Sequence, residues 1–155
     1  MVQHADIDHT GLTGVGGSVS LVAQKIVRTS ADYTTTSATL VDVDTANLTI
    51  TLTTGARRCL VGLTGTGTNS SASGRMDVAF EIDGAVPNGA FMLISQHSEV
   101  ANPMNISMVF LTDVLTAASH DFVLQFARGS AGTGTLFAST TQPLCFYVVE
   151  TLLTS

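Results

Sequence analysis

The chain contains no tryptophan, a single lysine (Lys25) and few charged residues of either sign. Six Lys and Arg residues stand against twelve Asp and Glu in 155 residues, which gives a formal net charge of -6. Nucleic-acid-binding modules need a basic surface that neutralises phosphates, and six cations cannot build one. The same shortage excludes surface helices rich in Glu and Lys. We therefore expect no nucleic-acid partner and a chain that favours strands and turns.

Long apolar runs are also missing. The longest, such as Met104–Leu111 and Leu144–Val149, are far shorter than the roughly 20 residues of a membrane span. We expect a soluble protein with no membrane partner. Residues 2–6 show neither a basic region nor an apolar one, so no classical secretory signal is expected. Cys59 and Cys145 lie inside apolar runs, and we expect free, buried thiols there rather than a disulfide.

A period-two pattern of large apolar residues is the main structural signal. It is clearest at Leu48–Leu52, Val78–Ile82 and Phe122–Phe126, where every second side chain is apolar, as in half-buried strands. Further strand candidates are Leu21–Arg28, Tyr33–Val43, Arg57–Thr64, Phe91–Ser95, Asn105–Thr112, Gly134–Ala138 and Leu144–Leu152. About ten short strands separated by close turn signals predict an all-β, antiparallel two-sheet β-sandwich. A jelly roll is the first choice and an immunoglobulin-like sandwich the second.

The first 18 residues differ from the rest in their glycine content and their lack of hydrophobic periodicity. We predict an irregular, extended arm at 1–18 and a β-sandwich domain at 19–155. The arm carries His4, Asp6, Asp8 and His9 within six residues, so three copies meeting on an axis could hold a cation octahedrally. A polar arm also carries such residues for solubility or for contact with a partner, and we assign no metal and no cofactor.

Two of the predicted strands carry apolar residues on both faces, whereas a sandwich strand in a monomer needs only one apolar face. A symmetric homo-oligomer would bury the second face against a neighbouring copy. The alternative is that loops of the same subunit cover both faces. The subunit-interface residues predicted on these strands are Met104, Ile106, Met108, Phe110, Phe146 and Val148.

Catalytic motifs are absent or weak. No Gly-x-Ser-x-Gly element occurs, and no histidine lies near Cys59 in sequence. Two carboxylate pairs, Asp42 with Asp44 and Glu81 with Asp83, have the spacing of one strand face and would suit glycoside hydrolysis if they lined a cleft. A solvated strand face is the more common reason for such a spacing, and there is no tryptophan to form a sugar platform. We expect no enzyme activity.

Several segments resemble bacteriophage virion proteins. The arm His4–Gly17 is similar to a peptide near the start of tail fibres and head-attached surface proteins, ahead of a β-structured domain. Thr39–Leu52, Ser119–Gly129 and Gly132–Ala138 resemble the C-terminal head domains of those proteins. The resemblance implies a homotrimer with an outline like the tumour-necrosis-factor jelly roll, and no active site.

The resemblance and the short arm together predict a virion structural protein on the particle surface, made in the host cytoplasm. An arm of about 18 residues reaches at most ~60 Å, which suits docking on a shell. We predict a capsid decoration or head-fibre protein whose arm binds the major capsid protein or another virion protein. The alternative is a tail-fibre tip that recognises a host glycan or protein through loops Gly65–Gly74 and Gly84–Gly89. The predicted attachment residues are His4, Asp6, Ile7, Asp8, His9, Leu12 and Val15.

Overall fold

The structure, a computed structural model, describes residues 23–72, 74–95 and 102–153, which contain eleven strands and no helix. All pairs of named strands are antiparallel, so the predicted all-β antiparallel class is confirmed. No described helix is long and apolar enough to cross a membrane. The strands are β1 (Ala23–Arg28), β2 (Tyr33–Thr35), β3 (Val41–Asp42), β4 (Thr49–Thr53), β5 (Cys59–Asn69), β6 (Arg75–Ile82), β7 (Phe91–Ser95), β8 (Met104–Leu111), β9 (Ser119–Ala127), β10 (Gly134–Phe137) and β11 (Leu144–Glu150).

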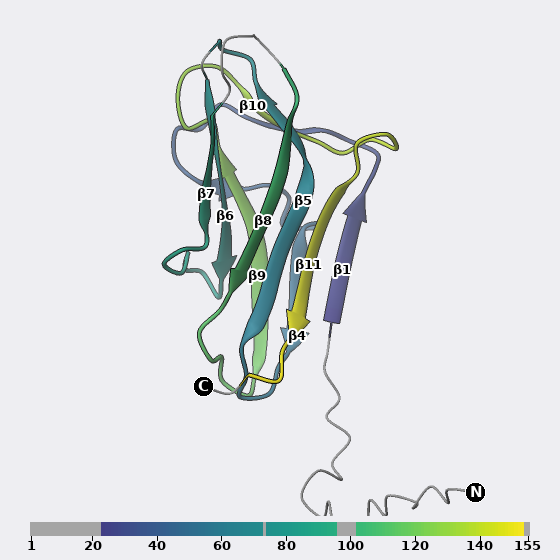
Figure 1. The fold of residues 1–155 in the computed structure, drawn as a ribbon, viewed down its shortest axis with the longest axis vertical. Helices are drawn as coiled ribbons and strands as arrows, with labels where there is room; N and C mark the ends of the chain where they lie inside the picture. The colour runs from purple at the N-terminus through teal and green to yellow at the C-terminus, as the bar shows by residue number, and fades with distance from the viewer. Residues whose placement is uncertain (1–22, 73, 96–101, 154–155) are drawn as a thin grey trace, which may run out of the picture.

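The strands form two sheets that pack against each other as a β-sandwich (Figure 1). Sheet A has six strands in the order β1-β11-β5-β10-β2, and β8 pairs with the other side of β5. Sheet B has five strands in the order β3-β9-β6-β7, and β4 also pairs with β9. In Figure 1, β8, β5, β11 and β1 of sheet A lie side by side across the view.

The core lies between the sheets because the period-two pattern points one side of each strand inward. Met76, Val78 and Phe80 of β6 are fully buried there. Phe80 stacks on Phe146 of sheet A, with ring centroids 5.8 Å apart and an interplanar angle of 22°. Burying one such side chain contributes about 1.5–3 kcal/mol, so these contacts hold the two layers together.

The structure differs most from the prediction at Tyr33–Val43 and at the strand predicted over Arg57–Thr64. The predicted strand Tyr33–Val43 is two strands, because the chain leaves β2 in sheet A and crosses to β3 in sheet B. The predicted turn Gly65–Gly74 is wrong over its first half, where β5 continues to Asn69 and pairs with β8 and β10. A Cβ at Gly67 would lie 2.5 Å from Met76 and 2.9 Å from Ile106, so glycine permits close packing inside this strand rather than a turn.

Candidate functional site: the outer face of sheet A

The six residues predicted at a subunit interface lie on the inner side of sheet A. Ile106, Met108, Phe146 and Val148 are buried in the core of this one chain. Met104 and Phe110 are partly buried and pack against the same core. The prediction assigned the wrong face of β8 and β11, since a side chain buried inside its own chain offers no surface to a neighbour.

The outward side chains of the same strands form a second, different surface. The pairing register aligns Leu60 with Leu111 and Val149, and one step along the strands it aligns Gly62 with Val109 and Tyr147. We call this surface the sheet A patch; its apolar members are Val27, Leu60, Val109, Leu111, Cys145, Tyr147 and Val149. Toward the other end of the sheet the outward residues are polar, namely Thr64, Thr66, Asn105 and Ser107.

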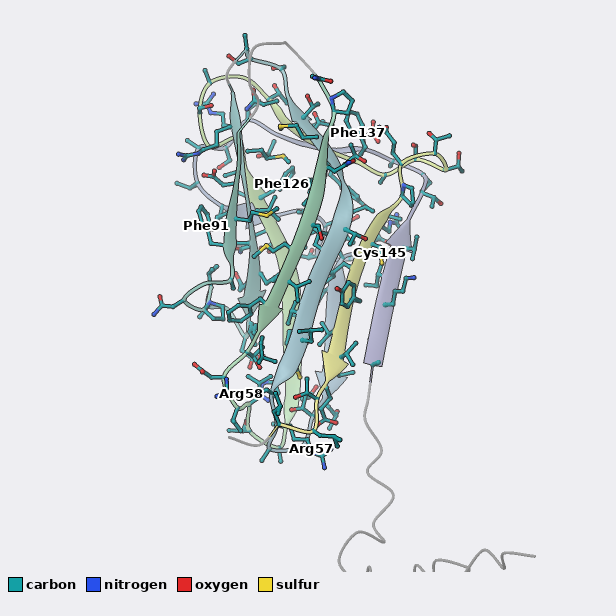
Figure 2. All side chains as sticks on the ribbon, in the orientation of Figure 1. Arg57, Arg58, Phe91, Phe126, Phe137 and Cys145 are labelled. Atoms are coloured by element: carbon teal, nitrogen blue, oxygen red, sulfur yellow. The ribbon has the colours of Figure 1, made fainter. Side chains whose placement is uncertain are left out.

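The sheet A patch is open to solvent in the single chain. Val109 is 56% exposed, Val27 48% and Leu111 41%. A Cβ at Gly62 would lie 2.1 Å from the Tyr147 ring, so this ring lies over Gly62 and fills the space that a side chain would need. Figure 2 shows Cys145 on β11 of this sheet, above Arg57 and Arg58 at the lower end of the sandwich.

Charge is almost absent from this face. Lys25 is the one charged residue among the outward positions of β1, β5, β8 and β11. The protein carries 18 charged residues in all, so their near-exclusion from one sheet face leaves that face ready for an apolar contact.

The outer face of sheet B is mixed: it contains the exposed Phe91 and the buried Ala79 and Val123, and beside them polar residues that are hydrogen-bonded within the chain. The Gln125 side-chain amide Nε2 donates to Asp42 Oδ1 at 2.8 Å and also to Glu81 Oε2. Arg75 Nε lies 2.8 Å from Asp77 Oδ1 in an ion pair. These polar residues therefore have partners within the chain, unlike the sheet A patch.

The carboxylate pairs predicted from spacing are rearranged in the structure. Gln125 joins Asp42 to Glu81, while Asp44 accepts hydrogen bonds from the Ala46 and Asn47 backbone and from the Asn47 side chain. The Asn47 side chain is the main reason that the pKa of Asp44 lies below its ordinary value. These are structural contacts, and a hydrolase arrangement gains no support from them.

His120 and Asp83 form an ion pair at the end of β9. His120 Nδ1 lies 2.6 Å from Asp83 Oδ2, and its Nε2 lies 3.0 Å from the Thr116 carbonyl oxygen. Burial alone would lower the pKa of His120, but these two acceptors outweigh it and raise the pKa. Burial likewise opposes the lowering of the Asp83 pKa, which the hydrogen bonds from His120 and the Asp121 N–H bring about. Both ring nitrogens face acceptors, and both can donate together only when the imidazole is protonated.

A buried carboxylate, Glu150, closes the lower end of the sandwich. Glu150 is 2% exposed, accepts a hydrogen bond from the Gly55 N–H at 2.5 Å and lies 3.5 Å from Arg57. Cys59, in the facing strand, is free and buried, and burial followed by the nearby Glu150 charge raises its pKa to about 11. Cys145 is free and half-buried, so the predicted free thiols are confirmed, though only Cys59 is fully buried.

The predicted attachment residues, from His4 to Val15, and the whole arm 1–18 lie outside the described residues. Within 23–72, 74–95 and 102–153, no group of three or more His, Cys, Asp or Glu residues could hold a metal ion. The predicted receptor loop Gly65–Gly74 shrinks to a short connection after β5, and Gly84–Gly89 joins β6 to β7.

A signal for which face of β8 points outward was present in the sequence. In β8 the polar residues Asn105 and Ser107 share one face with Val109 and Leu111, whereas Ile106 and Met108 share the other. The face that contains the polar residues had to be the outer one. Val109 and Leu111, at the end of this face, are therefore the apolar side chains that the single chain leaves exposed.

Comparison with protein-family models found no family that matches this chain, and comparison with curated proteins found no relative. The fold and its surfaces are therefore the basis of the functional assignment.

Proposed function

We propose that this chain is a non-enzymatic structural protein of a virus particle, which trimerises through the sheet A patch and docks on the particle through its N-terminal arm. The apolar, nearly uncharged face of sheet A carries the proposal, because exposed apolar patches of this kind mark interaction surfaces. The virion setting rests on the resemblance of the arm and of three body segments to phage virion proteins.

A second copy of the same chain is the occupant that fits this face best. Identical subunits with a net charge of -6 repel each other, and the electrostatic repulsion is weakest where the facing surfaces carry no carboxylates. The sheet A patch meets this condition, since Lys25 is its only charged neighbour among the outward residues of β1, β5, β8 and β11. The acidic outer face of sheet B, which contains Asp42 and Glu81, does not meet it.

The strand connectivity supports the jelly-roll form of the proposal. Strand pairs β1–β11, β4–β9, β5–β8 and β6–β7 are nested in chain order, as in one long hairpin rolled into two sheets. β1 begins at Ala23, which pairs with Val149 near the end of β11. The described part of the chain therefore begins beside Val149, a member of the sheet A patch.

The test of self-association is a matched pair of substitutions. Val109→Lys places a charge in the patch, and Val86→Lys makes the same change at a 37% exposed valine between β6 and β7, outside sheet A. Losing the burial of one valine, about 1.5–3 kcal/mol, and adding a charge should weaken each contact at least tenfold. By light scattering we expect trimers for the wild type and Val86→Lys, and monomers for Val109→Lys. A monomeric wild type contradicts the proposal.

The arm is tested separately on particles assembled without this protein. Deleting residues 1–17 should leave a soluble trimer that no longer binds those particles. Because a protein that binds only the assembled shell stabilises it, the full chain should also raise the temperature at which the particles dissociate. Retained binding by the shortened chain would show that attachment does not use the arm.

A further inference from the structure

A polar crevice lies at the end of the sandwich opposite Ala23. It is formed by the β1–β2 connection and by the residues that follow β10, and its volume is about 310 Å³. Arg28, at the end of β1, pairs with Leu144, at the start of β11, so both connections leave the sheet at this same end. The crevice is lined by Thr29, Ser30, Ala31, Asp32, Ala138, Ser139 and Thr140.

The two walls of the crevice are joined by one hydrogen bond. Asp32 Oδ1 accepts the Ala138 N–H at 2.9 Å, which fixes the carboxylate against the opposite wall. Ser139 and Gln142 exchange backbone hydrogen bonds of 3.1 and 3.2 Å, and the Ser139 hydroxyl accepts the Gln142 N–H at 3.0 Å. The second wall is therefore a closed turn, while Thr29–Asp32 in the first wall are exposed to solvent.

Several polar groups of the crevice are exposed and make no hydrogen bond to other described residues, so they are open to a ligand. Among the described residues, no donor contacts the second oxygen of Asp32, and no partner contacts the hydroxyls of Thr29, Ser30 or Thr140. The free groups are thus one strong acceptor and three hydroxyls that both donate and accept. The two alanines, Ala31 and Ala138, add small apolar surfaces between them.

This set of groups selects a class of ligand. No cation lines the crevice, and the Asp32 carboxylate repels anions, so phosphate, sulfate and acidic sugars are disfavoured. A charged acceptor beside several hydroxyls pairs well with adjacent hydroxyls of a ligand, because each can donate to the carboxylate and accept from a neighbouring side chain. The volume lies at the lower end of the range for small-molecule sites.

We propose that this crevice binds a neutral saccharide, with two adjacent sugar hydroxyls donating to Asp32 and exchanging hydrogen bonds with the surrounding Ser and Thr hydroxyls. No aromatic residue lines the crevice, so each single site is weak. A trimer would present three copies and gain avidity; this part alone rests on the proposed function. The crevice lies at the end of the sandwich opposite Ala23, where the described part of β1 begins.

The experiment uses the full chain and three simple probes, the methyl pyranosides of glucose, galactose and mannose. Backbone amide spectra are recorded during titration of each sugar into the wild type. We expect saturable shifts for at least one sugar, confined to 29–32 and 138–140. No shift with any of the three sugars, or shifts located elsewhere, overturns the proposal.

The decisive variant is Asp32→Asn, which keeps Oδ1 as the acceptor for the Ala138 N–H and replaces the free oxygen by an amide donor. It should bind the sugar at least tenfold more weakly. Asp113→Asn is the matched control, because it makes the same change at an exposed carboxylate paired with Arg58 near the other end of sheet A, and it should bind like the wild type. Unchanged binding by Asp32→Asn overturns the proposal.

Two further titrations distinguish a sugar site from a cation site and test whether binding depends on the trimer. Calcium chloride alone is titrated, since a carboxylate among hydroxyls can also hold a cation; if calcium saturates the same amides and sugar does not, the site is a cation site and the saccharide proposal fails. Val109→Lys is titrated with the same sugars and should keep the affinity of a single site. A monomeric wild type that still binds sugar would contradict only the proposed trimer.

Discussion

Replacing Glu150 tests what a buried carboxylate contributes to the lower end of the sandwich. Its Oε1 accepts the Gly55 N–H at 2.5 Å, and its Oε2 lies 3.5 Å from Arg57, whose side chain is 26% exposed. A hydrogen bond to a charged acceptor contributes about 1.5–3 kcal/mol. The ion pair contributes less than a fully buried one, because water screens the exposed guanidinium.

Glu150→Ala removes both contacts and leaves the Gly55 N–H without its acceptor. We expect a loss of about 2–3 kcal/mol in the free energy of unfolding. For a domain of this size each kcal/mol lowers Tm by about 2–4 °C, so Tm should fall by about 5–10 °C. Glu150→Gln keeps an oxygen for the N–H and avoids the cost of burying a charge, so its unfolding free energy should stay within about 1 kcal/mol of the wild type.

Urea and thermal unfolding of the wild type and both variants measure these differences. Asp113→Asn, at an exposed carboxylate on the same end, serves as the control and should change the free energy by less than about 0.5 kcal/mol. If Glu150→Ala costs less than this control, or if Glu150→Gln costs as much as Glu150→Ala, the hydrogen bond to Gly55 is not what stabilises this end.

Two other predictions concern titration and thiol chemistry. Because the folded-state pKa of His120 is raised, its ion pair with Asp83 stabilises the fold fully below pH 6.5, and this stabilisation is lost as pH rises through the raised value. The pKa of Asp83 is lowered in the fold, so the stabilisation from its ionised carboxylate is present above pH 3.8 and is lost on further acidification. Unfolding free energies from pH 5 to 9 should therefore decline for the wild type but much less for His120→Gln, and equal slopes would refute the pair's role. Cys59, with a pKa near 11 and no exposed surface, should not react with a thiol reagent in native Cys145→Ser protein and should react on unfolding; a fast native reaction would contradict its burial.

The sequence pattern predicted the strands well wherever side chains alternate. Val78–Ile82 lies within β6 and Phe122–Phe126 within β9. The turn residues Asp83 and Gly84 connect Ile82 to Ala85, which exchange two backbone hydrogen bonds. Pattern failed at Gly65–Asn69, because glycine in a strand and glycine in a turn look alike in sequence. The distinction depends on Met76 and Ile106, which approach Gly67 from distant parts of the chain.

The candidate site was predicted less well than the fold. The pattern predicts apolar residues on both faces of β8 and β11, and the inward residues were predicted at the interface because Phe146 and Ile106 are more hydrophobic than Tyr147 and Val109. Hydrophobicity alone does not separate the two faces, because core burial and exposed apolar surface both use such residues. The crevice was missed because it depends on the pairing of Arg28 with Leu144, which brings two short connections together without any motif in either.

The placement of β1 beside β11 has a mechanical consequence. Ala23 and Val149 are paired at one end of two adjacent antiparallel strands, and Arg28 and Leu144 are paired at the other. A force that pulls Ala23 away from Val149 would break the hydrogen bonds between these strands one pair at a time, starting at this end. A force along the strands would instead load all the pairs at once. β1 is an edge strand of sheet A and would separate first under such a force. The sandwich core, where Phe80 stacks on Phe146, would stay folded at that stage.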